Sequence, residues 1–451
     1  MKKTLAWAAE SMQGQLVGAD TQFSSISTDT RNIKRGDLFV ALRGDNFNGE
    51  AFVERAQQQG ACAAVVSRLQ EDLDFPQIVV ADTTTALGRL AAAWRLQLPA
   101  KVVAITGSCG KTSVKGMLRC ICQQAGATLA TKANLNNHIG VPLTLLAADE
   151  TLDFVVVEAG TSSKGEIAYL SSLIQADVAV VINVHPAHLQ GFGTLTAIAE
   201  EKAKIYQHLN DSASCVVNQA LTSYSSIAAI AERPSSLIFS DDKHSLAQVR
   251  ASNVSSDALS CVSFDLWLGE KKIAVKLNVP GLHLVENALA AAACAFALGV
   301  SAEHICQGLA AYNGEPGRMQ LSRVGQASLV DDSYNANPAS LKAAIDYLCK
   351  QDSALLVLGD MAELGENAEE IHREVGLYAK TSGITDLYAV GAFADDYCDG
   401  FGRGAKHFMN HKDLVLALLE RLHEAPTILV KGSRSSAMDR VCQALLQEGG
   451  Q

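Results

Sequence analysis

The segment KVVAITGSCGKTS (101–113) constrains the fold of this chain more than any other. Its first six residues form an apolar run suited to a buried parallel β-strand, and a loop with two glycines, Gly107 and Gly110, follows directly. Lys111 and Thr112 then open a segment of helical character. A parallel strand that turns through a short loop into a helix is the repeating unit of doubly wound sheets. The segment therefore predicts an α/β domain built on a parallel sheet.

Similar apolar runs, alternating with helical periodicity, extend this pattern along the chain. The expected strands are 37–42, 63–67, 77–82, 101–106, 154–160, 177–183, 328–334, 354–360, 386–391 and 427–433. The expected helices are 51–60, 85–97, 195–209, 339–350, 367–381, 411–423 and 437–447, with another close to the first residue. The polar stretch 232–260 suggests surface connections around an added antiparallel section.

The length of 451 residues suits about three domains. We expect an N-terminal α/β domain (1–99), a central P-loop domain with a parallel sheet (100–312) and a C-terminal, Rossmann-like doubly wound domain (313–451). No G-x-G-x-x-G follows the first strand of the third block, so the pattern does not predict dinucleotide binding there.

Composition excludes several classes of protein. The net charge of −11 argues against a nucleic-acid or membrane-surface binder, which needs a cationic face. No apolar run approaches the roughly 20 residues that cross a bilayer, and the start MKKTLAWAAESMQG is better explained as a helix than as a signal peptide. The 11 cysteines include no C-x-x-C pair, which is typical of reduced thiols in a cytoplasm and makes zinc unlikely as a cofactor.

The glycine loop also predicts phosphate binding. Its glycines allow backbone N–H groups to surround phosphate oxygens at a helix N-terminus. Lys111 would reach the β/γ-phosphates, and the Thr112 hydroxyl would hold Mg²⁺. The match to G-x-x-x-x-G-K-[ST] is partial, because the first glycine would fall at Ile105. The alternative is a tight turn with an incidental lysine, but strand, glycines, Lys-Thr and helix in this order favour a nucleotide site.

Three further positions are candidates for the same site. Glu158 ends a predicted parallel strand, where doubly wound sheets place their ligands. His185 and His188 follow the next strand, but Mg²⁺ prefers oxygen ligands, and each His taken alone is better explained as a hydrogen-bonded loop residue. Lys202 is indistinguishable by spacing from a solvated surface lysine.

Several longer segments resemble the Mur ligases, ATP-dependent enzymes that form amide bonds in peptidoglycan synthesis. They occur in order over nearly the whole chain: GSCGKTS (107–113), TKANLNNHIGVPLTLL (131–146), VVVEAGTSSKGEI (155–167), NVHPAHLQGFGTL (183–195), PGLHLVENALAAAA (280–293) and GRM (317–319). The resemblance implies a cytoplasmic, three-domain ligase that uses ATP and Mg²⁺, with two ions expected, and that acts as a monomer without nucleic-acid or membrane partners.

Four other segments resemble the family member that adds a terminal dipeptide: 27–49, 330–345, 357–366 and 430–439. This implies that D-alanyl-D-alanine is joined to UDP-N-acetylmuramoyl-tripeptide through an acyl phosphate, with release of ADP and phosphate. The alternatives are a sibling ligase with another amino-acid substrate and a non-catalytic P-loop switch. A switch would need Lys111 and Thr112 but not the other matched positions together.

The resemblance also assigns roles to residues. The ATP site would comprise Gly107, Ser108, Cys109, Gly110, Lys111, Thr112, Ser113, Asn287, Arg318 and Asp332. The catalytic residues would be Lys111, Glu158, His188 and Lys202. The metal ligands would be Thr112, Glu158, His188 and Lys202, the last as a carbamate. His185 falls at a position that varies in the family, so the resemblance assigns it no role. Substrates would contact Thr30, Arg31, Asn134, Asn137, Tyr334, Asn335, Asn337, Lys431 and Ser433.

Three positions depart from the family pattern. Leu284 replaces an asparagine of H-N-x-x-N, so any role of that side chain is lost or moved. Cys109 occupies a variable loop position where only the backbone should matter, and Asp439 stands where glutamate is frequent. None of these changes a group assigned to the chemistry.

Overall fold

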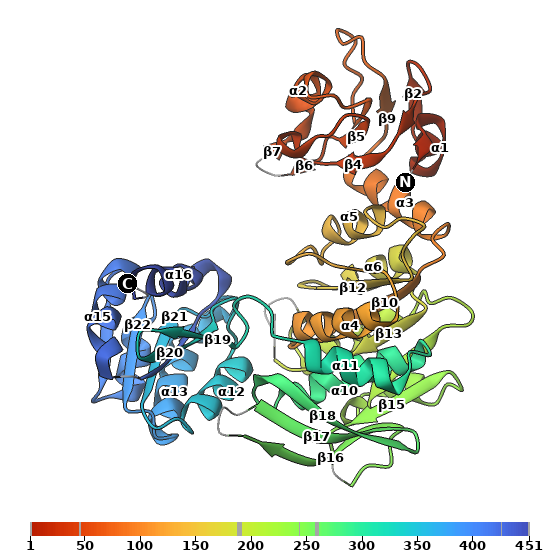
Figure 1. Cartoon of the computed structure of the whole chain (residues 1–451). Helices are drawn as coiled ribbons and strands as arrows, with labels where there is room; N and C mark the ends of the chain where they lie inside the picture. Colours follow the sequence, from red (N-terminus) through yellow and green to blue (C-terminus); the bar gives the residue numbers. More distant parts are fainter. Residues whose placement is uncertain are drawn as a thin grey trace.

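The computed structural model describes residues 2–44, 47–186, 192–242, 244–257, 261–424 and 426–449. Three α/β units follow one another along the chain, each around its own main sheet (Figure 1). This confirms the predicted fold class. In the described part of the chain, no helix is long and apolar enough to span a membrane.

The N-terminal unit has a five-stranded sheet in the order β2-β9-β8-β5-β4, parallel except for β2 at its edge. Its elements are β1 (Lys3–Thr4), α1 (Leu5–Met12), β2 (Gln15–Val17), β3 (Gln22–Phe23), β4 (Ser25–Ser27), β5 (Asp37–Val40), β6 (Arg43–Gly44), β7 (Phe47–Asn48), α2 (Val53–Gln58), β8 (Ala63–Val66), β9 (Gln77–Val79) and α3 (Thr83–Arg95). All four residues of β5 and of β8 are buried, as expected for inner parallel strands.

The central unit has a nine-stranded sheet in the order β11-β12-β10-β13-β14-β15-β16-β17-β18. Its elements are β10 (Lys101–Thr106), α4 (Lys111–Ala125), β11 (Thr128–Ala130), α5 (Gly140–Leu146), β12 (Phe154–Glu158), α6 (Glu166–Ile174), β13 (Val178–Val181), α8 (Leu195–Ala203), β14 (Ser214–Asn218), α9 (Ser225–Ala231), β15 (Ser236–Ser240), β16 (Val249–Ser256), β17 (Cys261–Leu268), β18 (Lys271–Pro280), α10 (Leu284–Ala297) and α11 (Ala302–Ala311). The sheet is parallel as far as β16 and antiparallel from there to β18, so the antiparallel section extends well beyond the polar stretch that suggested it.

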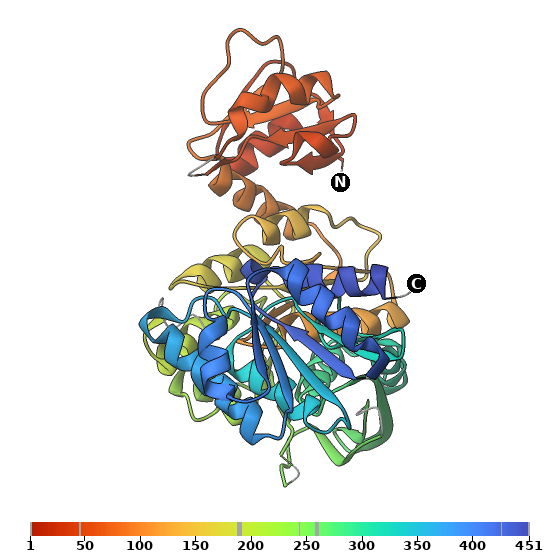
Figure 2. The ribbon, with the colours of Figure 1, turned by 90° about the vertical axis from the view of Figure 1, so that its left-hand side faces the viewer.

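The C-terminal unit has a six-stranded sheet in the order β19-β20-β24-β21-β22-β23 (teal to blue in Figure 2), parallel except for the hairpin of β19 with β20. Its elements are β19 (Gln320–Val324), β20 (Ala327–Asp332), α12 (Pro338–Leu348), β21 (Ala354–Gly359), α13 (Ala368–Thr381), β22 (Asp386–Val390), α14 (Ala394–Phe401), β23 (Ala405–Phe408), α15 (His411–Arg421), β24 (Thr427–Lys431) and α16 (Asp439–Glu448).

Two strands and one helix of this unit were not expected from the sequence: β19, β23 and α14. Both strands lie at the edges of the sheet and are largely exposed, so they lack the apolar run by which the inner strands are recognised. The helix α14 has the sequence ADDYCDGF, in which three acidic residues and a glycine dilute the apolar pattern.

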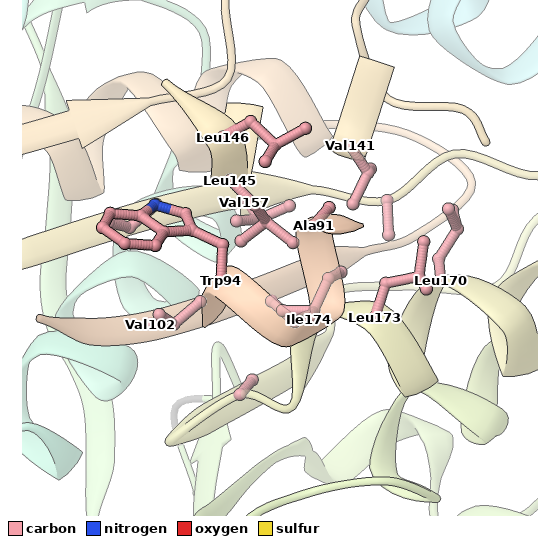
Figure 3. Close-up of a cluster of buried hydrophobic side chains, with 14 of the residues drawn as sticks. Ala91, Trp94, Val102, Val141, Leu145, Leu146, Val157, Leu170, Leu173 and Ile174 are labelled. Carbon is pink, nitrogen blue, oxygen red and sulfur yellow. The ribbon is translucent and has the colours of Figure 1, made fainter. Parts of the chain in front are cut away.

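Helix α3 packs against both the N-terminal and the central units. Its buried side chains join one hydrophobic cluster with α5, α6 and the central strands (Figure 3). The indole N–H of Trp94 donates to the carbonyl oxygen of Ala148 at 3.0 Å. Arg95 donates to the Ile174 carbonyl and pairs with Asp177 at 2.9 Å. The N-terminal unit is therefore fixed to the central sheet through a shared core.

The predicted domain boundaries at 99/100 and 312/313 fall between α3 and β10 and between α11 and β19. Because α3 packs on both sides of the first boundary, that boundary separates two sheets but not two cores. The division of the chain at these residues stays a prediction.

We predict that Trp94→Ala destabilises this junction. Removing a fully buried indole from a packed core costs about 3–5 kcal/mol of unfolding free energy. The neighbouring Leu96 is 68% exposed, so Leu96→Ala should cost about 0.5 kcal/mol or less. Denaturant titration of both variants checks this, and equal losses would contradict the shared core.

Candidate active site

The glycine loop joins β10 to α4 at the carboxyl end of the central sheet. β10 pairs in parallel with β12 on one side and β13 on the other. The chain continues from β10 to β11 and β12 on the first side and then crosses to β13 on the second, so the strand order reverses at β10. Such a switch point is where open α/β sheets bind ligands. Gly110 has a φ of 77°, and a Cβ there would collide with the side-chain oxygen of Asn287. A glycine is therefore required at this position.

Two ammonium groups meet at one carbonyl of this loop. Lys111 Nζ and Lys202 Nζ donate to the Gly107 oxygen at 2.9 and 3.0 Å. Lys202 is only 3% exposed, and burial together with the Lys111 charge lowers its pKa to about 7. Burial also lowers the pKa of Lys111, which the charge of Glu158 opposes. This concentration of positive charge beside a helix N-terminus is suited to a polyanionic ligand.

Asn183 binds the first part of the loop. Its backbone oxygen accepts from the Ser108 N–H at 3.1 Å, and its side-chain oxygen accepts from the Cys109 N–H at 3.0 Å. The Ser108 hydroxyl and the backbone of His185 exchange two hydrogen bonds of 3.0 Å. His185 thus contributes to the shape of the loop through its main chain. Burial lowers the pKa of its imidazole.

Glu158 lies behind the loop, with 2% exposure. Its Oε1 accepts from Asn136 Nδ2 at 2.8 Å and from the Thr112 hydroxyl at 3.5 Å. Its Oε2 accepts no hydrogen bond among the described residues and lies 3.5 Å from Lys115 Nζ. A buried carboxylate oxygen without a hydrogen-bond donor, next to a hydroxyl, is a fitting ligand for a hard cation.

The described residues contain no group of three or more His, Cys, Asp or Glu that could hold a metal ion. His188, one of the predicted ligands, lies outside the described residues. A cation at Glu158 would therefore depend on Thr112 and on a further anionic oxygen that the unmodified side chains do not supply here.

The C-terminal unit forms the second wall of a cleft over the loop. Asp332, at the end of β20, accepts from Lys431 Nζ at 2.5 Å and from the Met319 N–H at 3.2 Å. The Arg318 guanidinium lies 4.3 Å above the ring of Tyr334. The predicted residues that line this cleft are Ser108, Cys109, Gly110, Lys111, Thr112, Ser113, Asn287, Arg318, Asp332, Tyr334, Asn335, Asn337 and Lys431.

The phosphate loop and the C-terminal unit touch directly. Asn337 caps α12 by accepting from the Ser340 N–H at 2.9 Å, and its Nδ2 lies 3.4 Å from Cys109 Sγ. Asn335 accepts from the neighbouring Ala336 N–H, while its backbone oxygen accepts from Lys431 at 2.9 Å. The N-terminus of α12 therefore faces the loop across the cleft.

The structure does not bring the remaining predicted residues into the cleft. Thr30 and Arg31 lie in the N-terminal unit, where Arg31 pairs with Asp29 and is 79% exposed. The Asn137 side chain accepts from the N–H groups of Ile139 and Gly140 at the start of α5, and Asn134 is exposed in the same loop. Ser433 is buried, bonded through its hydroxyl to Ser435. Any role of these residues requires a substrate that extends from the cleft or a different arrangement of the units.

Four residues at the site escaped sequence analysis: Lys115, Asn136, Asn183 and Glu286. Lys115 and Asn136 are recognised only by their contacts with Glu158, and Asn183 only by its contact with the loop. Glu286 is recognised by its contact with Asn183, and all these contacts join distant parts of the chain. Asn136 lies between Asn134 and Asn137, the two asparagines to which the resemblance assigned a role.

Comparisons with known proteins agree with this geometry. Three family models match: "Mur ligase family, catalytic domain" over 22–95, "Mur ligase middle domain" over 105–295 and "Mur ligase, glutamate ligase domain" over 317–434. The chain is 40% identical over 450 residues to UDP-N-acetylmuramoyl-tripeptide–D-alanyl-D-alanine ligase of Escherichia coli (strain K12), covering 99% of each chain.

Solved structures give the same result. MurF from Acinetobacter baumannii superposes with a TM-score of 0.91 at 32% identity, over 99% of each chain. MurF ligase from Thermotoga maritima in complex with ADP superposes with a TM-score of 0.83 at 25% identity, over 94% of this chain and 97% of that one. From the ordered motifs, the three α/β units and these matches, the chain belongs to the Mur ligase family.

Proposed function

We propose that this chain is an ATP-dependent ligase that joins D-alanyl-D-alanine to UDP-N-acetylmuramoyl-tripeptide and releases ADP and phosphate. The observation that carries the proposal is the cleft in which the phosphate loop faces Arg318, Asp332 and Lys431. The full-length similarity to ligases named for this reaction supports it. We place the reaction in the cytoplasm and the enzyme in the monomeric state.

A carboxylate is a poor electrophile, so the tripeptide's terminal carboxylate would first attack the γ-phosphate of ATP to give an acyl phosphate and ADP. Lys111 and the N–H groups at the start of α4 offset the charge on the phosphates. The amine of the dipeptide then attacks the acyl carbon, and phosphate leaves as the amide forms. A cleft closed by Arg318 and the α12 N-terminus would exclude water, which hydrolyses acyl phosphates.

The residues present fit Mg²⁺ beside the phosphates. Thr112 and Glu158 would hold it, with Lys202 as a carbamate and His188 as the further ligands, and we expect two ions. Bound Mg²⁺ would neutralise phosphate charge and polarise the transferred group. Carbamylation would occur when the neutral Lys202 amine attacks the carbon of CO₂ and a proton is lost, which creates the anionic oxygens that the unmodified side chains lack.

The other predicted roles are proposals on the same footing. Asn287, which already touches Gly110, would contact the adenine, and Arg318 and Asp332 would meet the nucleotide. Thr30 and Arg31 would bind the uridine diphosphate from the N-terminal unit. The peptide parts would lie along a surface that includes Asn134, Asn137, Tyr334, Asn335, Asn337, Lys431 and Ser433.

The purified protein should release phosphate only when ATP, Mg²⁺, UDP-N-acetylmuramoyl-tripeptide and D-alanyl-D-alanine are all present. The acyl phosphate is sheltered from water, so turnover awaits the amine. A coupled phosphate assay with each component omitted in turn measures this. Release that ignores the dipeptide would refute the substrate assignment.

Lys202→Ala should lower kcat by roughly 100-fold or more, because the carbamate that would join the cation site is lost. A small carboxylic acid, such as acetate or formate, should restore part of the activity by occupying the vacated space. Lys204→Ala is a matched control, since Lys204 is half-buried on the same segment and its ammonium pairs with Glu201 at 2.7 Å, not with the Gly107 carbonyl. Full activity of Lys202→Ala would rule out the carbamate.

Uptake of ¹³CO₂ by Lys202 should depend on pH. With a pKa lowered to about 7, the amine is largely neutral above that pH and protonated below it. The carbamate carbon signal in NMR should therefore be present at pH 8 and decline as the pH falls through about 7. An exposed lysine, with a pKa near 10.4, would stay protonated throughout this range. Absence of a Lys202-dependent signal at pH 8 would contradict the proposed modification.

A further inference from the structure

Glu286 is a carboxylate that lines the same cleft as the phosphate loop, and the proposed reaction does not use it. It lies in the first turn of α10. In the described part of the chain no lysine or arginine forms a salt bridge with it. Its partners are two side-chain amides: Asn218 Nδ2 donates to Oε1 at 2.7 Å, and Asn183 Nδ2 donates to Oε2 at 3.4 Å. Burial raises the pKa of this carboxyl group, and the two amides oppose that shift.

These bonds determine how Asn183 is oriented. An ionised carboxylate can only accept hydrogen bonds, so each amide must turn its NH₂ group toward Glu286. The side-chain oxygen of Asn183 then points the other way, where it accepts from the Cys109 N–H at 3.0 Å. Asn183 is 5% exposed and Asn218 is 2% exposed, so water does not offer an alternative partner for a rotated amide.

The hydrogen bonds of Asn183 also determine which N–H groups of the loop can bind a phosphate. Because Asn183 takes the N–H groups of Ser108 and Cys109, those two groups are not available to a phosphate. The N–H groups left for an anion begin at Gly110 and continue into the first turn of α4. The same fixed peptides direct the Gly107 carbonyl at Lys111 and Lys202.

We propose that Glu286 is a positioning residue for ATP: it orients the Asn183 amide, which holds the Cys109 peptide and so sets the phosphate loop in its binding conformation. The inference rests on the proposed function only in that the loop binds the phosphates of ATP. The side chain of Asn287, the next residue of α10, lies against Gly110. One turn of α10 therefore positions the loop at Gly110 directly and at Cys109 through Asn183.

A donor–acceptor swap tests this without changing side-chain size. Glu286→Gln leaves one oxygen facing two NH₂ groups, and Asn183→Asp sets two carboxylates against each other. In the double variant the new glutamine donates to the new aspartate, whose other oxygen still accepts from Cys109. Each single variant should weaken Mg-ADP binding in calorimetry about tenfold, and the double variant should return to within about threefold of the native protein.

Glu270→Gln, in the exposed turn after β17, is the matched control and should bind ADP like the native protein. KM for ATP should rise in the single variants while KM for the UDP-linked substrate stays unchanged, a division that general destabilisation would not produce. If Asn183→Asp does not fold, the affinities of Glu286→Gln and of the double variant for Mg-ADP are sufficient to test the proposal.

Native affinity in both single variants would overturn the proposal. A double variant that binds ADP no more tightly than Glu286→Gln would also overturn it. If that variant in addition bound GDP in preference to ADP, Glu286 would be shown to contact the base itself. Failure of the native protein to bind ADP would instead refute the nucleotide site, so the two failures are distinguishable.

Discussion

The site depends on one electrostatic arrangement, the meeting of Lys111 and Lys202 at the carbonyl of Gly107. Two ammonium groups so close together repel each other, and burial removes the water that would screen them. Glu158 is the anion that most favours the charge on Lys111, and it is shared with Lys115 and Thr112. This repulsion favours the neutral form of Lys202, the form that carbamylation needs. Carbamylation would replace one of the two positive charges by a negative one, and Mg²⁺ and the phosphates of ATP would then complete the charge balance of the site.

That arrangement is held by parts of the chain that lie far apart. Lys202 comes from α8, Asn183 follows β13, and the second wall of the cleft comes from the C-terminal unit through Asn337. The shared core under α3 ties the N-terminal unit, proposed to hold the uridine nucleotide, to the same central sheet. A three-part enzyme of this kind can bind each substrate on a different unit and bring the reacting atoms together at one loop.

The sequence predicted the family, the α/β class and the phosphate loop, because strand, glycines, Lys111 and helix are neighbours in the chain. Lys202 could be named only by resemblance, since its partner Gly107 lies 95 residues away. Glu286 had no local signal at all, because its role follows from the amide that it faces. The edge strands β19 and β23 were missed for a related reason: an exposed strand is paired by the sheet and has no apolar pattern of its own.

The negative net charge of the chain argued against binding to nucleic acids or membrane surfaces, yet two lysines meet at the phosphate loop. Binding of a phosphorylated ligand therefore depends on the charges at the site and not on the net charge of the chain. In the proposed reaction, ATP phosphorylates a carboxylate at this loop. The most direct measurement uses tripeptide substrate labelled with ¹⁸O in its terminal carboxylate. If both carboxylate oxygens carry the label, one ¹⁸O atom should appear in each phosphate released with amide product. Phosphate without the label would show that the carboxylate was never phosphorylated and would contradict the acyl-phosphate reaction.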